Sequence, residues 1–244
     1  MANTPEAPDR RRLLVLWDVD HTLIETRGVG RAIYDRAFPA ATGRPLATLA
    51  SISGRTELDI MRESLRINGI QPSDEQVQAL ASALVEGYET ARDELLARGR
   101  ALPGAVEVLR LLADNPGIYQ SVLSGNLREV ARIKLEVFGL DRYLDLGAGA
   151  YGDDDPERPK LVAIAQARAA ERTGVMFSNE DTVVVGDTPK DVEAGLTAGV
   201  RVIGVATGKS TAEELAQAGA HYVIDDLCEA PELFSKLMRE LLGE

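Results

Sequence analysis

The segment Leu13–Asp20 constrains the fold more than any other part of the chain. Its first five residues are all apolar, ending at Trp17. Such a run is typical of a strand buried on both faces, at the centre of a parallel sheet. Asp18 and Asp20 follow with one residue between them. Buried carboxylates must be paired or hold a metal, and ligands of open α/β sheets bind at the carboxyl ends of strands. We therefore expect both acids at the mouth of a cleft.

The rest of the chain predicts an α/β fold. From about residue 101 onward, apolar runs of strand length alternate with segments of helical periodicity. This alternation is typical of a parallel sheet with helices on both faces, in a Rossmann-like arrangement. The expected later strands are Ile118–Leu123, Tyr143–Leu146, Thr182–Val185, Val202–Val205 and Tyr222–Ile224.

The stretch between the first strand and residue 100 shows helical periodicity alone. A block of helices placed directly after the first strand of a sheet is typical of an inserted unit with its own core. We predict a helical cap over 28–100 and a catalytic core over 13–27 and 101–244. Residues 1–12 hold prolines and arginines without an apolar segment, so we expect a disordered tail and not a signal peptide.

Charge and cysteine content narrow the classes of partner. The formal net charge is −12, which disfavours nucleic acid and anionic membrane surfaces. No apolar run approaches the length of a membrane span. Cys228 is the one cysteine, so an intrachain disulfide is excluded, and a reducing cytoplasmic location is expected. A small phosphorylated partner stays compatible with this charge if a metal neutralises the site.

Polar residues recur at the carboxyl ends of the expected strands, and together they resemble a known family. The order is Asp18-Val19-Asp20-His21-Thr22, then Ser124, then Lys160 in Arg158-Pro159-Lys160, then Gly186-Asp187-Thr188-Pro189-Lys190-Asp191. This order resembles the four motifs of the haloacid dehalogenase-like hydrolase superfamily. The resemblance covers nearly the whole chain from Leu13. It implies a hydrolase with a helical cap, and the second acid, Asp20, favours phosphate esters over carbon–halogen bonds.

Phosphoryl transfer requires a nucleophile, a general acid and positive charge on the phosphoryl oxygens. Asp18 is the expected nucleophile, forming an aspartyl-phosphate, and Asp20 the expected acid and base. Ser124 and the backbone N–H groups of Gly125 and Asn126 are expected to hold the phosphoryl oxygens. Lys160 is expected to neutralise Asp18 and the incoming phosphate.

Several carboxylates in one cleft would repel one another, which a divalent cation would relieve. Ligands that are all oxygen favour Mg²⁺. We expect Asp18 and Asp187 to bind it through their side chains and Asp20 through its backbone carbonyl. Asp191 is expected just outside this set, holding Lys160 or a metal-bound water.

Other polar residues have weaker assignments. Lys134 lies among charged neighbours and is expected on a helix surface. Asp153–Asp155 is most often typical of a solvated loop, although one of the three could touch the metal. His21 stands where members of the resembled family commonly carry glycine.

Two glycine-containing segments also bear on the site. Gly204–Thr211 is similar to a Walker A loop but has three residues between its glycines instead of four, so we interpret it as a loop and helix cap. The segment Ser53-Gly54-Arg55-Thr56 resembles a cap loop of the phosphoglycolate phosphatase and β-phosphoglucomutase branch. Arg55 could therefore bind a distal group of the substrate, although a surface arginine is an equal reading.

The function expected from these residues is a Mg²⁺-dependent phosphatase acting on a small phosphorylated metabolite. A phosphomutase would use the same residues, and a non-catalytic protein that binds phosphate or metal on the same fold is a second alternative. The oligomeric state and the identity of the substrate stay open.

Overall fold

The sheet has the predicted parallel architecture. The computed structural model describes residues 13–52 and 54–242, so the expected tail over 1–12 lies outside the described residues. Within that part of the chain, the main sheet has five parallel strands in the order β4-β1-β5-β6-β7. The strands are β1 (Leu13–Trp17), β4 (Ile118–Val122), β5 (Thr182–Gly186), β6 (Arg201–Val205) and β7 (Tyr222–Ile224).

The first strand is buried on both faces. Leu13, Val15 and Trp17 belong to one hydrophobic cluster, together with side chains of α5 and α10. Leu14 and Leu16 face the opposite cluster, which contains side chains of α7. The two-residue period of a strand thus explains why every residue of this run is apolar. The helices of this unit are α5 (Ala105–Ala113), α6 (Arg128–Val137), α7 (Arg158–Thr173), α8 (Pro189–Ala198), α9 (Ala212–Gln217) and α10 (Ala230–Leu242).

The register brings strand ends together at one edge. Trp17 pairs with Val122 of β4 on one side and with Val185 of β5 on the other. The residues that follow these three strands therefore emerge next to one another. This juxtaposition is the structural basis of the site described below.

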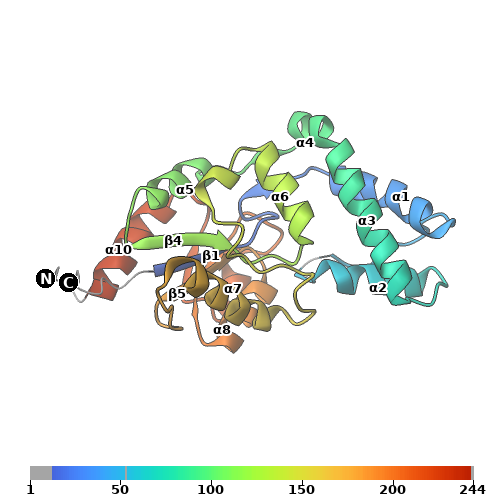
Figure 1. Ribbon diagram of the computed structural model, residues 1–244. Coiled ribbons are helices and arrows are strands. Elements are labelled where there is room, and N and C mark those ends of the chain that lie inside the picture. The colour runs from blue at the N-terminus through green and yellow to red at the C-terminus, as the bar shows by residue number, and fades with distance from the viewer. Residues whose placement is uncertain (1–12, 53, 243–244) are drawn as a thin grey trace, which may run out of the picture.

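A second group of helices lies beyond this edge. The short strands β2 (Ile24–Glu25) and β3 (Arg100–Ala101) pair antiparallel and carry the chain out and back. Between them lie α1 (Val29–Thr42), α2 (Glu57–Ile67), α3 (Asp74–Thr90) and α4 (Arg92–Arg98). In Figure 1 these four helices lie beyond the arrowhead of β4. Their apolar side chains form a separate cluster, which includes Val130 and Ile133 of α6 and the preceding Leu127.

The expected strand over Tyr143–Leu146 is wrong. A 3-10 turn, η1 (Asp141–Tyr143), occupies part of this segment, and the chain then turns away. The N–H of Asp145 bonds to the carbonyl of Gln120 in β4, at 3.0 Å. The Asp145 carboxylate then accepts a bond from the N–H of Gly147, at 3.0 Å. This local Asp turn interrupts the pairing with β4. The pairing resumes at Ala150, whose N–H bonds to the carbonyl of Val122 at 2.9 Å, so no ladder forms over Tyr143–Leu146.

No helix in the described ranges is long and apolar enough to cross a bilayer.

The Trp17 ring provides a test of the packing under α10. It is fully buried and lies 5.8 Å from the Phe234 ring, measured between centroids. Replacing Phe234 with alanine should leave a cavity and lower the free energy of unfolding by about 3 kcal/mol. Urea unfolding followed by the fluorescence of Trp17, the one tryptophan, measures this directly.

The matched control is Met176→Ala, because the Met176 side chain is 82% exposed. This variant should unfold at the urea concentration of the parent protein. Equal midpoints for the two variants would contradict the packing described for α10.

Candidate active site

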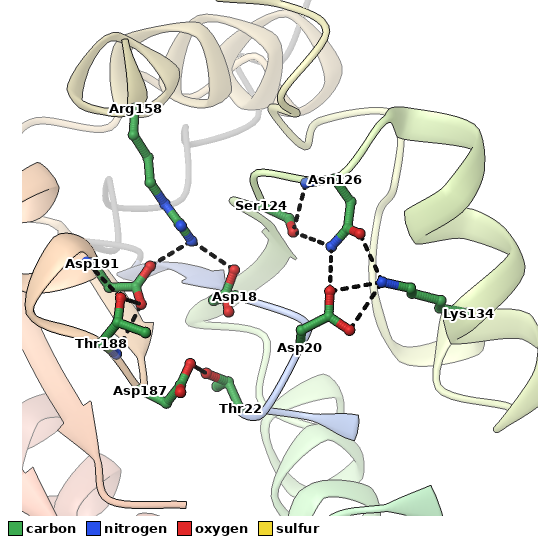
Figure 2. Close-up of polar contacts among 10 residues, drawn as sticks. All are labelled: Asp18, Asp20, Thr22, Ser124, Asn126, Lys134, Arg158, Asp187, Thr188 and Asp191. Carbon is green, nitrogen blue, oxygen red and sulfur yellow. Dashed lines mark hydrogen bonds and ion pairs between the residues drawn. The ribbon is translucent and has the colours of Figure 1, made fainter. Parts of the chain in front are cut away.

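Three buried carboxylates meet where β1 and β5 end. Asp18 follows β1, Asp187 follows β5, and Asp191 lies in the first turn of α8. One oxygen of each carboxylate lies within 4.8 Å of the others, and all three side chains are buried (Figure 2). The structure thus brings together the acids that the sequence placed at two strand ends.

Burial and mutual repulsion make this arrangement unfavourable for ionised groups. Burial, followed by the charge of Asp191, raises the pKa of Asp18 to about 7. Burial, followed by the charge of Asp18, raises the pKa of Asp187 to about 9. Positive charge placed among these groups would reverse both shifts. Their oxygens are the ligand type that Mg²⁺ prefers.

Arg158 supplies positive charge at this point. Its Nη2 atom lies 2.6 Å from the Asp18 carboxylate and also contacts Asp191. The Arg158 side chain is buried, and its Nε atom has no hydrogen-bond partner among the described residues. A guanidinium can bridge two carboxylates because it carries donors on several sides.

Lys160, predicted to occupy this place, does not reach the site. Its side chain is 55% exposed, and its Nζ atom lies 2.6 Å from Glu157. Residues two apart on a helix do not share a face, so Arg158 and Lys160 point in different directions from the start of α7. The prediction that Lys160 neutralises Asp18 is therefore wrong, and the basic residue that contacts Asp18 is Arg158. The sequence signal that could have identified Arg158 is its place directly before Pro159, at the start of the helix.

Asp191 has a structural task in addition to its contact with Arg158. One carboxylate oxygen accepts bonds from the N–H and the hydroxyl of Thr188, at 3.0 and 2.6 Å. This capping box fixes the start of α8. The expected partner Lys160 is thus replaced by Arg158 and Thr188.

Two segments lie against Asp187, and the sequence analysis predicted neither contact. The Thr22 hydroxyl lies 3.5 Å from its carboxylate. A Cβ atom at Gly208 would lie 1.8 Å from the other oxygen, so this backbone position must be glycine. Gly208 belongs to the loop that is similar to a Walker A motif, and the next residue, Lys209, lines the cleft. The end of that loop caps α9 through Thr211, as predicted.

Asp20 is held by Lys134 and Asn126. The Lys134 ammonium lies 2.9 and 2.7 Å from the two Asp20 oxygens, and the Asn126 amide donates to Asp20 at 2.8 Å (Figure 2). Burial alone would raise the pKa of Asp20, but the charge and hydrogen bonds of Lys134 lower it below its usual value. The two acids of the D-x-D motif therefore have pKa values shifted in opposite directions.

The expectation that Lys134 lies on the surface is wrong. Its side chain is only 4% exposed, because α6 is packed between the sheet and the cap helices. Its ammonium also lies 5.1 Å from the centre of the Tyr88 ring, a cation–π contact. A lysine in an amphipathic helix gives no sequence signal for such burial.

The loop after β4 lines a further side of the cleft. The Ser124 hydroxyl accepts bonds from the side-chain amide of Asn126 at 2.8 Å and from its backbone N–H at 3.3 Å. The carbonyl of Gly125 accepts a bond from the N–H of Glu57, at 2.7 Å. A Cβ atom at Gly125 would lie 2.2 Å from the Arg55 carbonyl oxygen, so the cap rests directly on this loop.

The cleft between these walls has a volume of about 410 Å³. Arg55 lines it, and the Nε atom of Arg55 donates a hydrogen bond to the Asp59 carboxylate at 2.6 Å. The side chains of Tyr34, Glu57 and Tyr88 line the cap side.

The acidic triplet Asp153–Asp155 lies outside the cleft and is bound locally. Asp153 accepts a bond from the N–H of Arg128, and Asp154 is paired with Arg168. These contacts match the solvated-loop interpretation and leave no part of the triplet in the site.

His21 occupies a turn that favours glycine. Its φ angle is +61°, in the left-handed region. This explains why the family commonly carries glycine at the position. The backbone carbonyl of His21 accepts a bond from the Thr207 hydroxyl at 2.6 Å, which ties the turn to the loop beside Asp187.

Comparisons with known proteins agree with this geometry. The family model described as haloacid dehalogenase-like hydrolase matches residues 15–195. "Probable phosphatase IndB" of Dickeya dadantii is 28% identical over 221 residues, covering 88% of this chain and 90% of the relative. "Phosphoglycolate phosphatase 1" of Pseudomonas aeruginosa is 25% identical over 223 residues, covering 88% and 76%.

Solved structures show the same fold. A hydrolase from Pseudomonas syringae superposes with a TM-score of 0.68 at 23% identity, covering 93% of this chain and 99% of that one. CbbY from Rhodobacter sphaeroides, solved in complex with phosphate, has a TM-score of 0.68 at 21% identity, covering 88% and 95%. On its sequence and on the carboxylates gathered at its strand ends, the chain belongs to the haloacid dehalogenase-like hydrolase family.

Proposed function

We propose that the protein is a Mg²⁺-dependent phosphatase that hydrolyses a small phosphorylated metabolite through an aspartyl-phosphate. The observation that carries this proposal is the pair of acids in the D-x-D motif. Asp18 is bridged by Arg158 beside two further carboxylates, whereas Asp20 is held apart by Lys134. Two acids in such different environments suit a nucleophile and a proton-transfer group.

In the first half of the reaction, an Asp18 oxygen attacks phosphorus and the bond to the ester oxygen breaks. Asp20 gives its proton to the leaving oxygen. In the second half, Asp20 takes a proton from water, whose oxygen attacks phosphorus and releases Asp18 with inorganic phosphate. A bound phosphate dianion raises the pKa of Asp20 toward the protonated form needed first, and Lys134 favours the ionised form needed second.

Cations and hydrogen-bond donors surround the position that the phosphoryl group would take. Arg158, which replaces Lys160 in this proposal, offers donors beside Asp18. The Ser124 hydroxyl and the backbone N–H groups of Gly125 and Asn126 would hold phosphoryl oxygens.

The chemistry of the donor set fits Mg²⁺. Asp18 and Asp187 would bind the ion through their side chains and Asp20 through its backbone carbonyl, with Asp191 orienting Arg158. The carboxylate oxygens of Asp18, Asp187 and Asp191 lie within 4.8 Å of one another, which is close enough for one cation. When bound, the ion supplies positive charge to the transferring phosphoryl group.

The helices over 28–100 would act as a lid on this cleft. The contact between the Glu57 N–H and the Gly125 carbonyl places the start of α2 directly over the phosphate-binding loop. Such a lid excludes water and selects the leaving group.

The nucleophile assignment is tested by Asp18→Asn. An amide is a far weaker nucleophile, so hydrolysis of p-nitrophenyl phosphate with Mg²⁺ should fall at least ~10³-fold. Circular dichroism should show an unchanged fold. Asp114→Asn, at the exposed residue that directly follows α5, removes the same charge and should keep full activity. Activity within tenfold of the parent in the Asp18 variant would remove Asp18 from the mechanism.

A second pair of variants separates Arg158 from Lys160. Arg158→Ala removes the cation beside Asp18, and kcat/KM should fall on the order of 100-fold. Lys160→Ala changes an exposed side chain two residues away and should stay within about twofold of the parent. Steady-state phosphate release measures both. Comparable losses in the two variants would argue against the assignment of Arg158.

The stability of the metal-free protein should fall with rising pH. Asp18 and Asp187 have raised pKa values of about 7 and about 9 in the folded state, compared with 3.8 as the ordinary value. At pH values between 3.8 and these raised pKa values, the unfolded chain binds fewer protons than the folded one. The free energy of unfolding therefore decreases as pH rises through this range. Added Mg²⁺ should therefore raise the melting temperature more at pH 9 than at pH 6.

The control for this experiment is Asp187→Asn, which removes one of the repelling carboxylates. Its melting temperature in excess chelator should vary less with pH, and Mg²⁺ should shift it less. A Mg²⁺ shift that is equal at both pH values, and equal in the variant, would count against the metal site.

A further inference from the structure

Glu57 is an acid of the cap that no step of the proposed reaction uses. It lies in the first turn of α2 and lines the cleft. Its N–H is bonded to the Gly125 carbonyl, which holds the residue over the loop after β4. Its carboxylate accepts a bond from the Tyr34 hydroxyl. Lys134 and Asp20 line the same cleft, and their charges act on this carboxylate. In the proposed reaction Asp20 protonates the leaving oxygen, so the leaving group would lie on this side of the cleft.

The Glu57 carboxylate lacks a cationic partner. Within the described residues, no lysine or arginine nitrogen lies within ion-pair distance of it, although Lys134 is close enough to act on its charge. Burial raises the pKa of Glu57 above its usual value. The single bond from Tyr34 leaves most of the hydrogen-bonding capacity of the carboxylate unused.

The arginines on the same side of the cleft, in contrast to Glu57, form ion pairs with neighbouring residues. Arg55 is paired with Asp59 at 2.6 Å, and Arg31 with Asp35 at 3.0 Å. Arg27 is paired with Glu25 at 3.3 Å. Arg55 and Arg31 each have an acid of their own, whereas Arg27 shares Glu25 with Arg100, which lies 3.0 Å from the same carboxylate. Arg55 and Arg31 therefore offer no uncompensated charge to an anionic leaving group.

Lys209 is the one lining cation of the described residues that has no ion pair, but it belongs to the other side. It follows Gly208, whose backbone packs against the Asp187 carboxylate. Its charge therefore adds to the wall that would face the metal and the phosphoryl group.

We propose that Glu57 selects the leaving group, accepting a hydrogen bond from a hydroxyl or ammonium group and repelling a carboxylate or second phosphate. This inference rests on the proposed phosphatase function and narrows its substrates to phosphate esters of alcohols that carry a further hydrogen-bond donor.

Four esters with the same phosphate test the proposal. Ethyl phosphate has no further donor, sn-glycerol 3-phosphate has hydroxyls, phosphoethanolamine has an ammonium group, and 2-phosphoglycolate has a carboxylate. With Mg²⁺, at least one donor ester should exceed ethyl phosphate in kcat/KM on the order of tenfold, the value of a hydrogen bond to a charged group. The glycolate ester should fall below ethyl phosphate. The better donor ester identifies the donor as hydroxyl or ammonium.

The variant Glu57→Gln should remove this ranking. Its readout is the ratio of kcat/KM between esters on the same protein, which a general loss of activity does not change. The advantage of the donor ester should fall to within about threefold, and the glycolate ester should rise relative to ethyl phosphate. Glu57→Asp keeps the charge on a shorter side chain. It should keep the rejection of glycolate and lose the donor advantage.

The matched control is Glu63→Gln. Glu63 lies on the same helix, is paired with Arg66 and lies outside the cleft lining, so the variant makes the same change of net charge. Its ratios should equal those of the parent protein. A parent preference for 2-phosphoglycolate, or unchanged ratios in Glu57→Gln, would overturn the inference.

Binding separates this inference from the proposed function. Isothermal titration of Asp18→Asn with the four esters and Mg²⁺ should give the same order of affinity without turnover. If the parent hydrolyses no ester, including p-nitrophenyl phosphate, the phosphatase proposal fails while this titration still decides the role of Glu57.

Discussion

Repulsion among Asp18, Asp187 and Asp191 is the constraint on which the site depends. Three buried carboxylates within 4.8 Å of one another are unfavourable without positive charge. The fold forces them together because β1 and β5 are neighbours in register and end at the same edge. Arg158 relieves part of this repulsion. The negative charge that remains favours the binding of a further cation at this site.

The two aspartates of the D-x-D motif show how environment separates identical side chains. Asp18 has like charges around it, and its pKa is raised. Asp20 lies two residues further along the chain, against the buried ammonium of Lys134, and its pKa is lowered. The difference comes from α6, which carries Lys134 and also packs against the cap helices. The helix that joins the two units thus also tunes the second acid.

Close backbone contacts between cap and core define the cleft. Gly125 approaches the Arg55 carbonyl, and Gly54, with a φ angle of +66°, lies against the Lys190 side chain; neither position has room for a Cβ atom. These contacts place Glu57 above the loop that follows β4. The proposed selection of the leaving group therefore depends on backbone packing at glycines, more than on the reach of long side chains.

The sequence by itself determined the architecture and the acids, and the tertiary structure decided the cations. The apolar run before Asp18 and the alternation of strands and helices suffice to predict a parallel sheet, because burial on both faces requires apolar residues at every position. Strand ends in such a sheet share one edge, so Asp18 and Asp187 could be placed together without coordinates. The Tyr143–Leu146 strand was wrong because a single Asp turn outweighed the apolar pattern.

Lys160 and Lys134 were wrong for a different reason. From sequence alone, a long basic side chain on a helix that faces solvent cannot be distinguished from one that faces a buried carboxylate. Its environment depends on the rotation of the helix and on what packs over it. Arg158 and Lys160 are two residues apart at the start of α7, so they point to different sides of that helix. Lys134 is buried because the cap helices cover α6. Both are properties of the packed molecule, because they depend on contacts between segments far apart in the chain.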